Sequence, residues 1–164
     1  GSGLHLIDIN QTDARIRTVA NFLSRYDPER ILIVSARQYG QRPARKFAQS
    51  IGAKRIVGRF IPGTLTNPKL RTYTEPEVLV VTDPAADSQA LSEAVSTGLP
   101  IVGIVDANNT LRNVDLALPA NNKGRRSLAL IYWLLAREML TSRGATNYAD
   151  WERAQDVEEW ESTF

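Results

Sequence analysis

The fold is decided by residues 78–105, which read VLVVTDPAADSQALSEAVSTGLPIVGIV. This stretch begins and ends with short apolar runs, residues 78–81 and 101–105, that are continuous rather than alternating. Continuous runs are typical of strands that are covered on both faces, as in a parallel sheet. A helical pattern between the two runs is marked by Leu91, Ala94 and Val95. The stretch therefore predicts a strand, a helix and a second, parallel strand joined by a right-handed crossover.

The same alternation extends to both sides of this stretch. Further apolar runs predict strands at residues 4–7, 31–34, 55–57 and 114–118. Apolar residues at helical spacing predict helices at residues 16–23, 44–51 and 125–141, and the last is apolar nearly all round and should be mostly buried. Strands that alternate with helices are typical of a doubly wound α/β domain with a mainly parallel sheet.

Residues 58–74 interrupt the alternation. They contain Ile61-Pro62-Gly63-Thr64 and Asn67-Pro68, which break regular structure where a crossover helix is expected. A long loop is therefore predicted, and loops of more than about 12 to 15 residues in compact domains are usually functional.

The length of 164 residues predicts a single folded domain. We assign this domain to residues 1–143 and treat residues 144–164 as an acidic tail. The tail carries Trp151, Trp160 and short helical potential from about Tyr148. It would either dock on the domain or remain mobile.

The composition excludes several classes of protein. The chain has no cysteine, which rules out disulfides and thiolate metal sites. Its longest apolar run, residues 128–136, is far shorter than the roughly 20 residues that cross a bilayer. No signal-peptide pattern opens the sequence. We expect a cytoplasmic protein with no membrane segment.

The charges are segregated along the sequence. Residues 30–74 contain ten Lys or Arg and no Asp or Glu, whereas residues 75–120 contain seven acids and only Arg112. A second basic block, residues 121–143, holds five Lys or Arg against Glu138, and the tail holds six acids against Arg153. Because solvated surfaces usually mix the two signs, the basic blocks favour a surface that faces a polyanion.

Three carboxylates each follow a predicted strand directly: Asp8, Asp83 and Asp106. Ligands bind beyond the carboxyl ends of strands in open α/β sheets, so such a cluster would suit Mg²⁺ or phosphoryl transfer. We favour the alternative, in which Asp83 and Asp106 bond their own backbone in turns. The only histidine, His5, falls inside a predicted strand, and no Ser/His/Asp set can be assembled. We therefore expect no enzyme, no metal and no cofactor.

Two basic segments are candidates for phosphate contact, although the chain contains no glycine-rich phosphate motif. Residues 121–127, NNKGRRS, lie at a predicted helix start, where backbone N–H groups and the helix dipole favour an anion. Cations at that position oppose the dipole and contribute little to stability, so phosphate contact is favoured over a merely solvated helix start. Residues 35–42, SARQYGQR, offer Arg for phosphate and Tyr39 or Gln41 for bases or sugars; the alternative is an ordinary polar loop.

Residues 121–138, NNKGRRSLALIYWLLARE, resemble the final helix of the archaeal small-subunit ribosomal protein S2 family. The family's pattern is also visible in residues 58–67, GRFIPGTLTN, and in residues 75–84, EPEVLVVTDP. It continues in Asp87, Gln89, Glu93, Gly98 and Pro100. The resemblance covers residues 4–143 and extends to the eukaryotic laminin-receptor-related protein SA.

This resemblance implies a flavodoxin-like three-layer sandwich without catalytic activity. It implies a structural role in the small ribosomal subunit, with ribosomal RNA and neighbouring ribosomal proteins as partners and with no small-molecule substrate. The helix and hairpin that precede the family's first strand are not found in this sequence, nor is the coiled coil of bacterial members. The Pro-Trp-rich ending of the eukaryotic relative is also absent, so no laminin binding is carried over.

The predicted RNA contacts come from the segments after the strands at 31–34 and 55–57 and from the start of the final helix. They are Arg37, Gln38, Gln41, Arg42, Arg45, Lys46, Arg59, Thr64, Thr66, Asn67, Lys69, Arg71, Asn122, Lys123, Arg125 and Arg126. The alternative function is a phosphosugar-binding, isomerase-type domain. It would use Ser35 and the strand-end loops for phosphate, but it lacks a general base.

Overall fold

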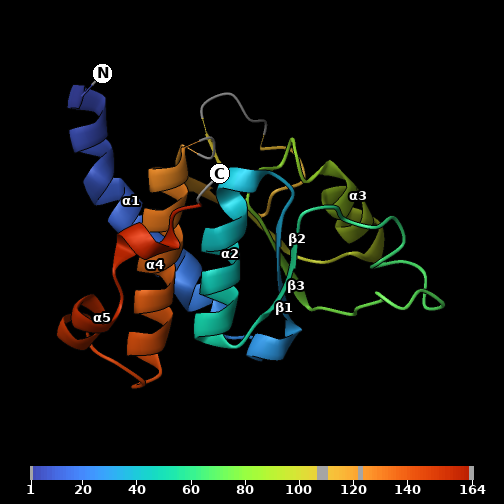
Figure 1. Ribbon diagram of the computed structural model, residues 1–164. Helices are drawn as coiled ribbons and strands as arrows, with labels where there is room; N and C mark the ends of the chain where they lie inside the picture. The colour runs from blue at the N-terminus through green and yellow to red at the C-terminus, as the bar shows by residue number, and fades with distance from the viewer. Residues whose placement is uncertain (1, 107–110, 122–123, 163–164) are drawn as a thin grey trace.

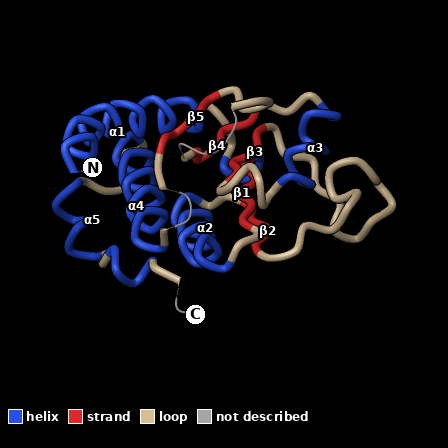
Figure 2. Tube along the Cα trace, turned by 90° about the horizontal axis from the view of Figure 1, so that it is seen from above, coloured by secondary structure: helices blue, strands red, loops and turns tan. Residues whose placement is uncertain are grey.

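The computed structural model describes residues 2–106, 111–121 and 124–162 (Figure 1). Within these residues, five parallel strands form one sheet in the order β2-β1-β3-β4-β5 (Figure 2). The strands are β1 (Ile31–Ser35), β2 (Lys54–Val57), β3 (Val78–Val81), β4 (Ile101–Val105) and β5 (Leu116–Pro119). This order is that of flavodoxin-like doubly wound domains, so the predicted fold class is confirmed.

Both faces of the central strands are buried, which explains why their sequences are continuously apolar. Strand β1 pairs with β3 in a register that sets Ile31 opposite Val78. Ile31 and Ile33 belong to the core cluster on one face of the sheet, whereas Leu32 and Val34 belong to the cluster on the other. Successive side chains of a strand point to opposite faces, so a strand covered on both sides needs apolar residues at every position.

The helices cover the two faces unequally (Figures 1 and 2). One face carries α1 (Ser2–Leu23), α2 (Gln38–Ile51) and α4 (Arg125–Ser142), and α4 packs against both of the others. The opposite face carries α3 (Ser88–Thr97) and the long loop of residues 58–77. The result is the predicted three-layer sandwich, with the loop taking the place of a crossover helix.

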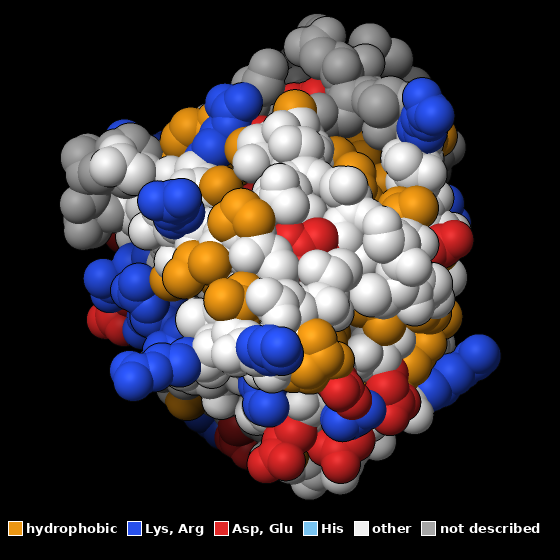
Figure 3. Space-filling view, turned by 90° about the vertical axis from the view of Figure 1, so that its right-hand side faces the viewer, with side chains coloured by type: hydrophobic (Ala, Val, Ile, Leu, Met, Phe, Trp, Pro, Cys, Tyr) orange, Lys and Arg blue, Asp and Glu red, His pale blue; other side chains and the backbone are white. Residues whose placement is uncertain are grey.

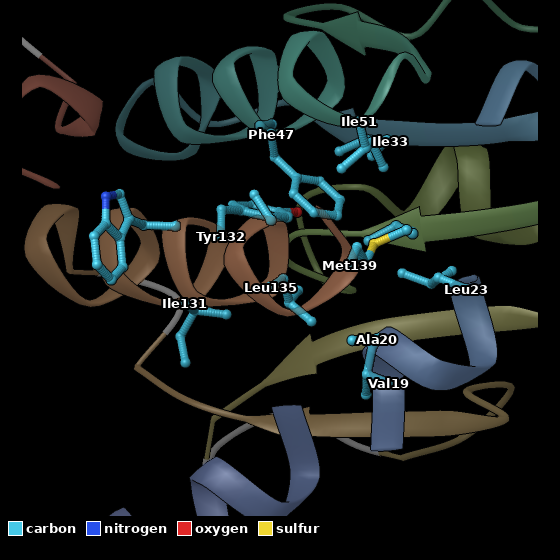
Figure 4. Close-up of a cluster of buried hydrophobic side chains, with 14 of the residues drawn as sticks. Val19, Ala20, Leu23, Ile33, Phe47, Ile51, Ile131, Tyr132, Leu135 and Met139 are labelled. Atoms are coloured by element: carbon cyan, nitrogen blue, oxygen red, sulfur yellow. The ribbon is translucent and has the colours of Figure 1, made fainter. Parts of the chain in front are cut away.

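The larger core cluster lies between the helical layer and the sheet (Figure 4). Phe47 of α2 and Tyr132 of α4 are fully buried, with ring centroids 5.1 Å apart. Leu23 of α1 and Met139 of α4 complete the contact between these helices and Ile33 of β1. Burial of side chains of this size is the main favourable contribution to folding. No helix in the described part of the chain has the length and apolarity needed to cross a membrane.

The C-terminal segment docks on α4, which settles one alternative left open by the sequence. It forms α5 (Tyr148–Ala154) and the short 3-10 helix η2 (Val157–Trp160). The ring of Trp151 lies 5.9 Å from that of Trp133 and 5.8 Å from that of Trp160. Trp160 is completely buried. The division of the chain at residue 143 stays a prediction.

Two sequence-based assignments of elements were wrong. Residues 4–7 are not a strand but part of helix α1, because a four-residue apolar run carries no periodicity that separates the two structures. Helix α2 begins at Gln38 rather than near residue 44. Its first buried positions are Gly40 and Pro43, which a search for apolar helix formers passes over.

Candidate nucleic-acid interface

The three segments that hold the predicted RNA contacts begin at the same edge of the sheet. In a parallel sheet the carboxyl ends of all strands meet at one edge, which is at the top in Figure 1. Helix α2 follows β1 there, the long loop follows β2, and α4 follows β5. Helix α4 packs along α2, so the first turns of these two helices are neighbours. The topology thus brings together cations that are up to about ninety positions apart in the sequence.

Arg37 is held at this edge by two neighbours. Its Nε lies 3.1 Å from Oδ2 of Asp83, as an ion pair rather than an aligned hydrogen bond, and its Nη1 donates a hydrogen bond of 2.7 Å to the hydroxyl of Tyr39. The hydrogen bond with Tyr39 and the charge of Asp83 raise the pKa of Arg37. The side chain is still 42% exposed, so the guanidinium is fixed in place and also accessible.

Asp87 occupies the point between β1 and β3 where doubly wound domains usually bind their ligand. The residue is only 4% exposed. Oδ1 accepts a hydrogen bond of 2.7 Å from the backbone N–H of Ala36, and Oδ2 accepts one of 3.0 Å from that of Asp83. Burial raises the pKa of Asp87 to about 7, although the two N–H donors oppose the shift. The backbone amides of Ala36 and Asp83 at this point are thus already satisfied by a carboxylate.

Ser35 is equally unsuited to the phosphosugar function considered above. Its residue exposure is 1%, and its hydroxyl donates a hydrogen bond of 3.3 Å to the carbonyl of Arg37. Gly40 of α2 packs so closely that a Cβ there would lie 2.5 Å from Ser35 Oγ. The isomerase-type alternative therefore has no support in the structure.

The metal alternative fails on its premise, because Asp8 lies within α1 and follows no strand. Asp83 bonds the backbone of its own turn, as predicted from the sequence. Its Oδ1 accepts a hydrogen bond of 3.1 Å from the N–H of Ala85. Across residues 13–106, 111–121 and 124–162, no three His, Cys, Asp or Glu side chains are placed to hold a metal ion.

The long loop presents most of its predicted contacts outward. Arg59, Thr66, Asn67, Lys69 and Arg71 are all exposed. Thr64 is buried instead, and its hydroxyl donates a hydrogen bond of 2.7 Å to the carbonyl of Ile61. On the face that α3 and the loop form, Lys and Arg side chains gather along one margin, and Asp and Glu side chains gather at the lower end (Figure 3).

The remaining predicted residues lie on α2 and α4. Gln38 and Arg45 are exposed on α2, Lys46 is half-buried, and the Gln41 side chain donates a hydrogen bond of 3.1 Å to the carbonyl of Ala36. These four lie on the helix rather than in a loop, because α2 starts early. Arg125 and Arg126 open α4 and are exposed, whereas Asn122 and Lys123 lie outside the described residues.

The C-terminal segment borders this surface, which sequence reasoning missed. The N–H of Arg42 donates a hydrogen bond of 3.3 Å to the hydroxyl of Ser162, and its Nε donates one to the carbonyl of Glu159. Nε of Arg126 lies 3.8 Å from Oε1 of Glu161, in a groove between the start of α4 and the C-terminal segment. The signal that could have placed this segment is its pair of tryptophans, which need burial in an otherwise acidic tail.

The chain matches the family described as ribosomal protein S2 over residues 1–75 and 69–142. It belongs to the ribosomal protein S2 family. The resemblance inferred from residues 58–67, 75–84 and 121–138 is therefore confirmed.

Two relatives of this family carry the name small ribosomal subunit protein uS2. That of Haloquadratum walsbyi is 56% identical over 143 residues, which make up 87% of this chain and 51% of the relative. That of Methanoregula boonei is 58% identical over 144 residues, or 88% of this chain and 71% of the relative. The chain thus spans about half to seven tenths of the length of these S2 proteins.

Proposed function

We propose that this chain is a structural, non-catalytic component of the small ribosomal subunit in the cytoplasm, where it binds ribosomal RNA and contacts neighbouring ribosomal proteins. The proposal is supported by the name that its relatives carry and by the family to which it belongs. The observation that carries it is that α2, the long loop and α4 all carry exposed cations and all begin at the same edge of the sheet.

The binding residues are proposed within this surface. Exposed arginine and lysine side chains would pair with RNA phosphates, because guanidinium forks and ammonium groups match phosphate oxygens. These are Arg37, Arg45, Arg59, Lys69, Arg71, Arg125 and Arg126. Gln38, Thr66 and Asn67 would contact sugars or bases. Thr64 is buried, so its contribution would be to the shape of the loop. We assign this binding to residues 1–143, with the acidic segment 144–164 at its border.

Each phosphate contact releases about one counterion, so binding must weaken as the salt concentration rises. Changing both Arg125 and Arg126 to Glu should weaken binding to small-subunit ribosomal RNA and reduce the slope of log affinity against log salt by about two. The measurement is a filter-binding series across salt concentrations, with co-sedimentation with small subunits as a second readout.

A matched control is available in α5. Arg153 is exposed and pairs with Asp150, away from the proposed surface. Arg153→Glu makes the same change of charge as Arg126→Glu but should leave the salt slope unchanged. Equal effects of these two single variants would show that only net charge matters, and unchanged binding by the double variant would overturn the assignment of the surface. Titration with sugar phosphates, which should not bind, tests the isomerase-type alternative in the same assay.

A further inference from the structure

The long loop is tied down by one side chain from α3. Glu93 is 6% exposed and lies beneath residues 63–66. Its Oε2 accepts a hydrogen bond of 2.9 Å from the N–H of Gly63, and its Oε1 accepts one of 3.0 Å from the N–H of Leu65. The hydroxyl of Thr66 lies 3.4 Å from Oε1, and Gln89 donates a hydrogen bond of 2.8 Å to Oε2. Both carboxylate oxygens are thus used.

These donors are neutral N–H and O–H groups of the loop and of α3, so Glu93 acts through hydrogen bonds rather than through an ion pair. Burial opposes its ionisation, but the hydrogen bonds from Gln89, Gly63 and Leu65 outweigh burial and lower the pKa of Glu93. A carboxylate that accepts two backbone N–H groups two residues apart fixes the backbone between them.

The local backbone depends on this arrangement. Gly63 has a φ of 95°, and a Cβ there would lie 2.9 Å from Cδ1 of Leu70. Leu65 is inserted into the core cluster on the α3 face and is 4% exposed. Leu65 and Glu93 together hold the centre of the loop in place. The cationic residues on both sides of this centre remain exposed. They are Arg59, Lys69 and Arg71.

We infer that Glu93 is a positioning residue for RNA binding: its carboxylate fixes residues 63–66 and thereby presents Arg59, Lys69 and Arg71 to phosphates at set positions. The inference rests on the function proposed above. A loop that is already ordered before RNA binds favours affinity, because ordering a loop and long side chains during binding costs free energy. Residues 30–74 contain no Asp or Glu, so the anchor of this basic loop has to come from another element.

The sign of the effect separates positioning from simple electrostatics. Glu93→Ala removes a negative charge beneath a basic loop, which by Coulomb attraction alone would strengthen RNA binding. If Glu93 positions the loop, the same change weakens binding, by about tenfold if three side chains lose their common platform. Glu93→Gln keeps one acceptor oxygen and should fall between Glu93→Ala and the unchanged chain.

A double-mutant cycle identifies the route of the effect. In a chain with Arg59, Lys69 and Arg71 all changed to Ala, Glu93→Ala should change RNA affinity by less than about twofold, since no presented cations remain. Combined with Arg125→Glu and Arg126→Glu, it should be additive, since α4 lies on the other side of the sheet. Far-UV circular dichroism confirms folding of each variant, and hydrogen exchange should show that the amides of Gly63 and Leu65 lose protection in Glu93→Ala.

The outcomes are distinct. Weaker binding by Glu93→Ala that disappears in the loop-cation background supports the inference. Unchanged or tighter binding, or an equal loss in both backgrounds, overturns the inference and leaves the proposed function standing. Failure of the unchanged chain to bind ribosomal RNA or small subunits overturns the proposed function and, with it, the inference.

Discussion

Replacing Trp160 of the short helix η2 by alanine should destabilise the whole domain. Its side chain is completely buried, its ring lies 5.8 Å from that of Trp151, and its Nε1 donates a hydrogen bond of 3.3 Å to Oε1 of Gln155. A buried tryptophan removes about 150–250 Å² from water, and at about 25 cal/mol per Å² this gives an upper estimate of about 4–6 kcal/mol.

Partial undocking of η2 would relieve some of this loss, so we expect the free energy of unfolding to fall by about 3–4 kcal/mol, within the range for large-to-small substitutions of buried aromatic residues. Urea unfolding followed by far-UV circular dichroism measures the change without depending on tryptophan fluorescence. Glu158→Ala, an exposed change in the same 3-10 helix, should stay within about 0.5 kcal/mol. A loss below about 1 kcal/mol for Trp160→Ala would refute the reasoning, because the docked segment would then not belong to the cooperative unit.

Two further predictions concern electrostatics. Glu161→Gln removes the carboxylate that lies 3.8 Å from Arg126. It should raise affinity for ribosomal RNA by about twofold to threefold at low salt, with no gain at high salt. An equal gain for the control Glu152→Gln, on α5, would contradict a local effect. The second concerns Asp87, whose pKa burial raises from 3.8 to about 7. The stability that this group contributes is therefore fully present below about pH 4 and is lost as the pH rises through about 7, so the advantage of the unchanged chain over Asp87→Asn in urea unfolding should shrink across that interval. A difference that stays constant with pH would show that Asp87 does not titrate there.

The parts of the fold that were predicted correctly are those with local causes. Strands β3 and β4 are continuously apolar because both of their faces are covered, and α4 is apolar nearly all round because it packs against α1, α2 and the C-terminal segment. The run at residues 4–7 misled because four residues, three of them apolar, fit a strand and a helix equally well. The start of α2 was missed because a glycine in the sequence suggests a turn. In the structure Gly40 lies in the helix, and its lack of a side chain allows close packing against Ser35.

In the candidate site, too, some features follow from the sequence and others do not. That the segments after β1, β2 and β5 share one edge follows from parallel topology, which the sequence predicts. The contacts that shape the surface do not follow from local pattern. Glu93 reaches Gly63 across 30 positions, and Arg42 meets Ser162 across 120. The sequence around Glu93 and around Ser162 contains no pattern that predicts such distant partners.

The carboxylate of Asp87 also has a consequence for small anions at the carboxyl ends of β1 and β3. Because the group is covalently attached and already aligned with the N–H groups of Ala36 and Asp83, its effective concentration at those amides far exceeds that of any dissolved phosphate. A nucleotide or inorganic phosphate would have to displace a permanently tethered competitor. We therefore expect dissolved phosphate to compete poorly for these two amides, whereas the exposed Arg and Lys side chains of α2, the long loop and α4 stay accessible.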